Sequence, residues 1–197
     1  LKQYSAKLTT AGTLRHMQSA SRISLDRLEL NSSLAPIVLR QPTEFELSDG
    51  QLTIPGASLS IAAGELTVQG TAGPRMDMDI AMRGLPLKIV NAVRPETGAT
   101  GTVSGTVKIT GTSNDPQIQF ALDGKGVAAQ PLTSNGIKPL SFSAKGGFSN
   151  QVLQLAALQA RNSQKLTLNA SGRLPLSASG LNFKAHGPLP LSLAHPA

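Results

Sequence analysis

The strongest constraint on the fold of this chain is a strict alternation of apolar and more polar side chains. Between residues 76 and 83 the apolar positions are Met76, Met78, Ile80 and Met82, and the intervening ones are Asp77, Asp79, Ala81 and Arg83. Successive side chains of a strand point to opposite faces, so a period of two predicts a half-buried strand. The same alternation returns at 103–109 and 118–122.

Turn-forming residues divide the chain into segments of strand length. Signals such as Asp49-Gly50 and the run 111–115 recur about every 8 to 12 positions, which predicts roughly 15 strands in an antiparallel meander. Pro55-Gly56 is expected to separate two strands, 51–54 and 58–61. We also interpret Gly124-Lys125-Gly126 and Lys145-Gly146-Gly147 as hairpin turns, because both lack the rest of a phosphate-binding loop.

One segment has a helical pattern. Its apolar residues fall at positions 87, 89, 90 and 93, which is one side of about two helical turns. Pro86 suits the first turn of a helix, and Pro95 ends it. The sequence therefore predicts one short helix around 87–93, directly before two long alternating strands.

A sheet with one apolar face must have that face covered, either by a filled sandwich or barrel or by curling into an open trough. Only 3% of the residues are aromatic and none is Trp, whereas compact sandwiches usually place large rings in their core. The 19 glycines include Gly105 within a strand, which is compatible with tight curvature. We therefore predict an all-β fold, an elongated and strongly curled antiparallel sheet about 70 Å long.

The apolar positions of these strands define the candidate site, a groove that accepts hydrocarbon. Removing each methylene from water is worth about 0.8 kcal/mol, so an aliphatic groove stabilises acyl chains without specific hydrogen bonds. Methionines on one strand face are compatible with ordinary core packing and equally with a surface that accepts varying apolar ligands. The predicted lining residues are Leu52, Ile54, Leu66, Val68, Met76, Met78, Ile80, Met82, Val103, Val107, Ile109, Ile118, Phe120 and Leu122.

Sites for catalysis, metals and cofactors are not expected. The chain has no cysteine, and none of its histidines, at 16, 186 and 195, has a second ligand at metal-binding spacing. No serine lies in a Gly-x-Ser-x-Gly motif, and Asp77 and Asp79 are interpreted as solvated charges. The net charge of +7 comes from cations scattered singly, without interleaved aromatics, which argues against nucleic acid as a partner.

Three segments in order, LPLKIVNAV (85–93), GTVSGTVKITGT (101–112) and NDPQIQFALDGKGV (114–127), resemble the repeat of the TamB family. This family belongs to the wider AsmA-like group of bacterial envelope proteins. The resemblance implies a taco-like curled sheet with an aliphatic interior. It also implies a periplasmic segment of a protein anchored in the inner membrane. The implied role is phospholipid movement between the inner and outer membranes, with an outer-membrane barrel partner of the TamA type.

The whole chain, 1–197, is expected to be one repetitive trough segment of a larger protein. The segment at 65–70 returns as the segment at 165–172, and Leu85-Pro86-Leu87 returns as Leu189-Pro190-Leu191. We therefore expect a repeat of about 100 residues with a joint near 84–101. The leading hypothesis is a non-enzymatic segment of a lipid-transfer bridge, and the alternative is a scaffold for outer-membrane protein or autotransporter assembly by β-augmentation.

Overall fold

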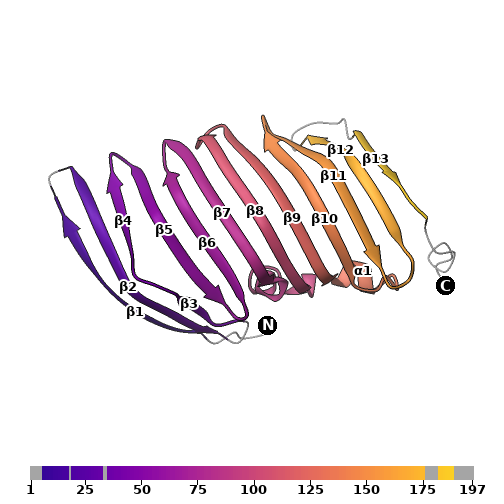
Figure 1. Cartoon of the computed structure of the whole chain (residues 1–197), viewed down its shortest axis with the longest axis horizontal. Coiled ribbons are helices and arrows are strands. Elements are labelled where there is room, and N and C mark those ends of the chain that lie inside the picture. The colour runs from indigo at the N-terminus through magenta and orange to yellow at the C-terminus, as the bar shows by residue number, and fades with distance from the viewer. Residues whose placement is uncertain (1–5, 18, 33–34, 176–181, 189–197) are drawn as a thin grey trace.

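The computed structural model describes residues 6–17, 19–32, 35–175 and 182–188 (Figure 1). Its strands form one antiparallel sheet of 13 strands, which confirms the all-β prediction, against the roughly 15 strands expected. The strands are β1 (Ala6–His16), β2 (Ala20–Ser32), β3 (Ile37–Leu39), β4 (Thr43–Ser48), β5 (Gln51–Ile61), β6 (Gly64–Ala72), β7 (Arg75–Pro86), β8 (Thr100–Thr112), β9 (Pro116–Ala128), β10 (Leu140–Ser149), β11 (Val152–Asn162), β12 (Thr167–Pro175) and β13 (Asn182–His186).

The predicted helix is present but takes a tighter form. It is a 3-10 helix, η1 (Leu87–Ala92), followed by a second one, η2 (Pro95–Thr97). No side chain caps η1, and the prolines at 86 and 95 confine it to a short segment. A one-turn helix, α1 (Gln130–Thr133), was not predicted, because four residues are too few for a periodic apolar pattern.

The strands follow one another across the sheet, except that β3 and β4 share one place between β2 and β5. Pro55-Gly56 does not separate two strands, so that prediction is wrong, because β5 runs through it as a bulge between Ile54 and Ala57. The Thr43 hydroxyl, at the start of β4, donates to the Gly56 carbonyl at 2.6 Å. This bond satisfies a bulged backbone group that would otherwise interrupt the strand.

Two glycine pairs expected in hairpin turns lie inside strands instead. Gly124 and Gly126 belong to β9, and Gly146 and Gly147 belong to β10. The pairing of β10 with β11 shifts by a bulge between Lys145 and Gly146, so the extra residue is absorbed without a turn. The hairpin prediction is wrong at both places, because glycine also marks bulges and close approach within a strand.

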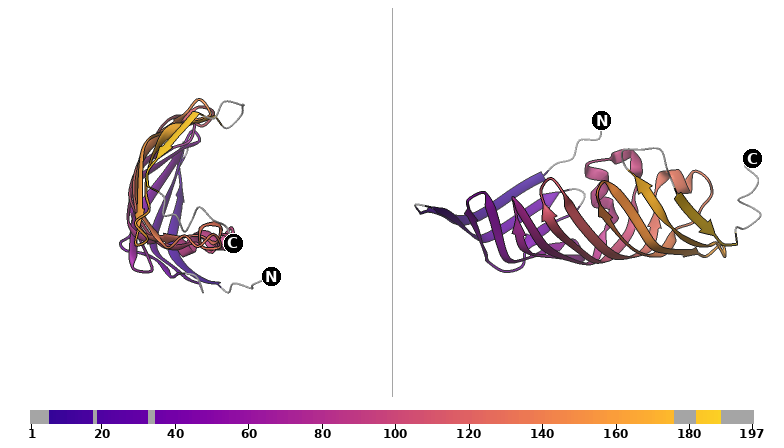
Figure 2. Two further views of the ribbon diagram at one scale, coloured as in Figure 1. Left: turned by 90° about the vertical axis from the view of Figure 1, so that its right-hand side faces the viewer. Right: turned by 90° about the horizontal axis from the view of Figure 1, so that it is seen from above.

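The sheet is curled and remains open. In cross-section it has the shape of a C, and of the described strands the outermost two each pair on one side, β1 with β2 and β13 with β12 (Figure 2). In the middle of β8, Gly105 has a φ of +144°, and an added Cβ would overlap the Ala121 carbonyl oxygen of β9. Twelve strands along this path, spaced about 4.8 Å apart, give a trough about 53 Å long.

Candidate functional site: an open apolar trough

The register of the sheet gathers the apolar positions of successive strands on one face, which we call the inner face. Residues paired directly across antiparallel strands point to the same side, so each line of paired residues crosses the sheet on one face. One such line is Leu39, Leu59, Leu66, Met82, Gly105, Leu122, Ala144, Leu158, Ala170 and Ala185.

The predicted lining residues all belong to the inner face. A second line runs Ala57, Val68, Ile80, Val107, Phe120, Gly146, Leu155, Gly172 and Phe183. A third runs Ile54, Gly70, Met78, Ile109, Ile118, Phe148, Leu153 and Leu174. At the margins Leu52 pairs with Ala72, Met76 with Gly111, and Val103 with Leu85. That these residues line a lipid groove stays a prediction.

The inner face extends beyond the residues selected from the sequence. Strands β10 and β11 add Phe142, Phe148, Leu153, Leu155 and Leu158 to it. The alternations of Phe142 with Ala144 and of Leu153 with Leu155 carried the signal for these positions. Near the N-terminus, β1, β2 and β4 add pairs such as Leu14 with Ile23 and Ile23 with Phe45.

Charge is missing from this face. No charged residue is among those that the described strands pair on the inner face. The polar side chains on this face lie near strand ends or beside the gap between β3 and β4, which share one place in the sheet. One of them is His16, whose Nδ1 lies 2.9 Å from the Ser21 Oγ. A charge in hydrocarbon is expensive, so this pattern suits contact with apolar groups over the whole length of the sheet.

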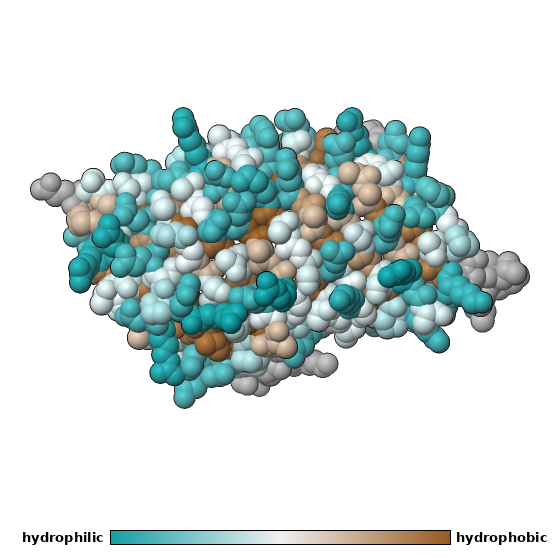
Figure 3. All heavy atoms as spheres, in the orientation of Figure 1, coloured by the Kyte–Doolittle hydropathy of each residue, from teal (hydrophilic) through white to brown (hydrophobic). Residues whose placement is uncertain are grey.

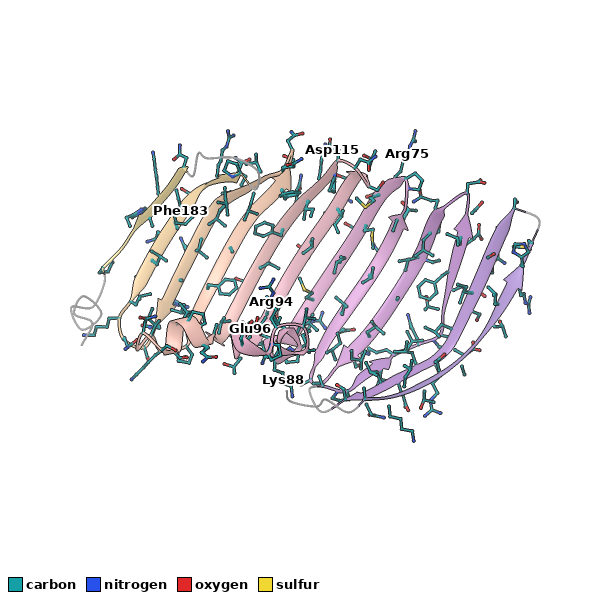
Figure 4. The ribbon with its side chains drawn as sticks, turned by 180° about the vertical axis from the view of Figure 1, so that it is seen from behind. Arg75, Lys88, Arg94, Glu96, Asp115 and Phe183 are labelled. Atoms are coloured by element: carbon teal, nitrogen blue, oxygen red, sulfur yellow. The ribbon has the colours of Figure 1, made fainter. Side chains whose placement is uncertain are left out.

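The inner face is the concave one. The helical segments η1, η2 and α1 lie on the open side of the C, along one edge of the trough (Figures 2 and 4). Ile89 of η1 packs against a small buried cluster of Ala35, Ile61 and Leu85. This contact fixes η1 over the ends of β5 and β7 that lie at this edge.

The protein's own side chains do not fill the trough. Among the described residues, none is less than 2% exposed, and most inner-face Leu, Ile and Met side chains are only half-buried. The chain exposes 12859 Å² of surface, against about 8,800 Å² for a compact monomer of 20.4 kDa. The described part of the chain is therefore a single layer, and its described residues leave the apolar face accessible.

The floor of the trough changes character along its length. In β9 to β13 phenyl rings lie against glycines of the neighbouring strand, Phe142 on Gly124, Phe120 on Gly146 and Phe183 on Gly172. Flat rings over glycines cover backbone that would otherwise be exposed, as aromatic side chains do over edge glycines. Figure 4 labels Phe183 within this region. The part formed by β5 to β8 is instead lined by Leu, Ile, Val and Met.

Polar residues cover the convex, outer face (Figure 3). Cross-strand ion pairs lie on it, including Arg22 with Glu46 at 3.0 Å. Lys108 Nζ lies 3.1 Å from Asp77 and 3.2 Å from Asp79, and these hydrogen bonds raise the pKa of Lys108. Such exposed pairs contribute little to stability. The two aspartates are thus bound to a lysine on the solvated face, away from the trough.

Two hollows, of about 990 and 840 Å³, lie on the outer face and not in the trough. The larger one forms where small side chains, Ala81 and Ala121, lie between longer polar ones such as Gln69 and Gln119. The trough is open along its length and is not enclosed. We take the inner face as the candidate site because its apolar surface is continuous, whereas the hollows have mixed linings.

Metal ligands are not clustered in the described part of the chain. His186 is exposed on β13, and His195 lies outside the described residues, as do Leu189-Pro190-Leu191. None of the helices in the described ranges is long and apolar enough to cross a bilayer.

Comparison with known proteins places the chain in a family. Neither a curated protein nor a solved structure matches it. A family model described as "TamB, N-terminal domain" matches residues 2–180, which is most of the chain. The match spans all the strands from β1 to β12 and therefore nearly the whole trough. The chain belongs to the TamB family.

Proposed function

We propose that this chain is a non-enzymatic segment of a periplasmic lipid-transfer bridge, in which the inner face shields phospholipid acyl chains between the inner and outer membranes. Residues 1–197 form one repetitive part of that bridge. Its partners are phospholipid acyl chains and an outer-membrane barrel of the TamA type, and the full-length protein is anchored in the inner membrane. No cofactor or metal takes part.

The observation that carries this proposal is an uncharged, unfilled concave face that continues across the described strands. A 16-carbon acyl chain in water carries a cost on the order of 12 kcal/mol, which contact with this surface relieves. Leu, Ile and Met side chains bind hydrocarbon without fixed geometry. Weak specificity suits a conduit, because tight capture at one point would stop passage.

The family supports the same function at a coarser level. TamB proteins are non-enzymatic proteins of the cell envelope, connected with the translocation and assembly module or with lipid transport, and they work with TamA-type partners. An extended open sheet with an uncharged apolar face, as the described strands form it, fits a conduit.

Lipid binding by the purified chain tests the proposal. Met78→Arg or Ile109→Arg places a charge in the middle of the inner face, and a charge among acyl chains costs about 2.5–3.5 kcal/mol. Native mass spectrometry should find phospholipid on the wild type and about a hundredfold less on either variant. In the full-length protein the same changes should stop lipid passage.

Thr106→Arg is the matched control, because Thr106 is an exposed outer-face residue of the same strand as Ile109. It should leave both folding and lipid binding unchanged. Circular dichroism checks that each variant keeps its strand content. Lipid-free wild-type protein, or full binding by folded Ile109→Arg protein, would contradict the proposal.

The free sheet edges favour the alternative function, a scaffold for outer-membrane protein or autotransporter assembly. Of the described strands, β1 and β13 each pair on one side only, and such edges accept an added strand. Photocrosslinkers at Thr13 of β1 and Lys184 of β13 should then capture unfolded barrel protein, while a crosslinker at Ile109 captures no lipid. The reverse pattern supports the lipid bridge.

A further inference from the structure

The meander brings alternate connections to the same edge of the trough. The connections 62–63, 87–99, 129–139 and 163–166 lie at one edge, which we call the helical edge because it carries η1, η2 and α1. The connections 49–50, 73–74, 113–115 and 150–151 lie at the opposite edge, which we call the hairpin edge. A molecule lying across the trough therefore meets a different edge at each end.

The two edges differ in charge. Among the described residues of its connections, the helical edge carries four exposed cations, Lys88, Arg94, Lys138 and Lys165, against one carboxylate, Glu96. The connections of the hairpin edge carry Asp49 and Asp115, beside Arg75 at the start of β7. Figure 4 shows Lys88, Arg94 and Glu96 along the helical edge and Arg75 and Asp115 along the other.

The cations of the helical edge are not used to hold the fold together. The ion pairs found in the described ranges involve other cations, Arg22, Arg27, Arg40, Arg83 and Lys108. Lys88, Arg94, Lys138 and Lys165 take no part in them, so their ammonium and guanidinium groups face solvent. They are placed where an anion at the mouth of the trough would meet them.

We propose that the helical edge binds the phosphates of lipid head groups whose acyl chains lie in the trough, so that phospholipids travel with their heads along this edge. This inference rests on the proposed function and adds an orientation to it. The hairpin edge, with its aspartates, is disfavoured for the same groups, because like charges repel. The ligand class is therefore a diacyl lipid with a phosphate in its head group.

Apolar side chains of η1 and of Val93, its C-cap residue, lie between the cations in the sequence and fit the same ligand. Val90 is 41% exposed and Val93 is 84% exposed, in a segment that also carries Lys88 and Arg94. A rim that offers valine next to cations matches the junction of a phospholipid, where acyl chain meets phosphate. The connections 87–99, 129–139 and 163–166 are two strands apart, so cations recur about every 10 Å over this part of the trough.

A lipid-preference experiment tests the edge separately from the trough. The purified chain is equilibrated with phosphatidylglycerol and diacylglycerol of identical acyl chains, and bound lipid is counted by mass spectrometry. Wild-type protein should be enriched in phosphatidylglycerol. The variant Lys88→Gln/Arg94→Gln/Lys138→Gln/Lys165→Gln should lose that enrichment by about a hundredfold or more, since each cation near an anionic lipid surface is worth about fivefold. Its diacylglycerol binding should not change.

The matched control removes four exposed outer-face cations that lie away from the helical edge, Arg15, Lys145, Arg173 and Lys184, and lowers the net charge equally. It should keep the enrichment. Equal loss in both variants, or retained enrichment in the edge variant, overturns the proposal. So does an edge variant that is impaired only in docking to phosphatidylglycerol vesicles, which would identify a bilayer surface as the ligand. If neither the wild type nor either variant binds diacylglycerol, the proposal that the trough binds acyl chains is contradicted.

Discussion

At the scale of single residues, the inner face depends on positions where glycine lies beneath a phenyl ring. At Gly124 an added Cβ would overlap the ring of Phe142 on the next strand. The ring then has to turn away from the backbone that it covers, and it loses contact on the trough floor. Glycine therefore leaves the room that the phenyl ring needs, although its conformational freedom weakens a strand.

We expect Gly124→Ala to lower the free energy of unfolding by about 1–3 kcal/mol, the usual cost of overpacking. Chemical denaturation of both proteins measures the difference. Gly56→Ala is the control, because Gly56 has no atom within 4 Å of an added Cβ and should be neutral or slightly stabilising. A destabilisation of equal size at both positions would show that the Phe142 ring is not responsible.

At the scale of elements, the connection from β7 to β8 is held against the sheet by one side chain. Asn91 Nδ2 donates to the Ala99 carbonyl at 3.0 Å, and the Ala99 N–H donates to Asn91 Oδ1 at 2.7 Å. Ala99 is 7% exposed, so water has little access to these backbone groups. The two bonds tie η1 to the start of β8 and thereby set the position of the helical edge.

Asn91→Ala should leave the two Ala99 backbone groups unpaired, which costs about 1–3 kcal/mol. Because the loss is local, amide exchange should quicken at 87–99 while the central strands keep their protection. Exchange measured by mass spectrometry tests this. Glu96→Ala, an exposed change in the same connection, should have no such effect, and unchanged exchange in Asn91→Ala would refute the role of these bonds.

The sequence predicted the repeating elements well and the interruptions poorly. The alternation at 76–83 and 103–122 reflects the direction of side chains, which point to alternate faces in any strand. The pattern therefore predicted on which face of the sheet Met78 and Ile109 lie. Gly146 and Pro55 were misassigned because their local signal, a break in backbone regularity, is shared by turns and bulges. Whether such a position is a turn or a bulge depends on its tertiary partner, which is the Phe120 ring at Gly146 and the Thr43 hydroxyl at the bulge that includes Pro55.

The candidate site was predictable in kind but not in extent. The residues chosen in β5 to β9 share one face because their periods are regular, yet the continuation into β10 to β12 needed the register across bulges. The sequence alone did not reveal the charge difference between the two edges either. Lys88, Lys138 and Lys165 are far apart in sequence and come to one edge only because strands alternate in direction.

At the scale of the whole molecule, the trough is a linear array. Substantial contacts between strands run to neighbours in the sheet, with only a few residues of β5 reaching β7. Within the described ranges no second layer joins the ends, so the stability of each strand comes from its own neighbours. Strands in the middle have partners on both sides, whereas β1 and β13 have one.

We therefore predict unfolding that starts at the ends. Amide protection should be greatest in β6 to β10 and should fall towards β1 and β13, and the denaturant m-value should lie below that of a compact domain of 197 residues. Leu8→Ala, on the inner face of β1, should reduce protection only in β1 and β2. Ile80→Ala, in the centre, should reduce it in β6 to β8 and leave β1 and β13 unchanged. Uniform protection, or a loss that spreads over the whole sheet from Leu8→Ala, would mean that the trough unfolds as one cooperative unit. Without that coupling, local opening at one end leaves the remaining apolar surface intact, which is what the proposed lipid-transfer function requires.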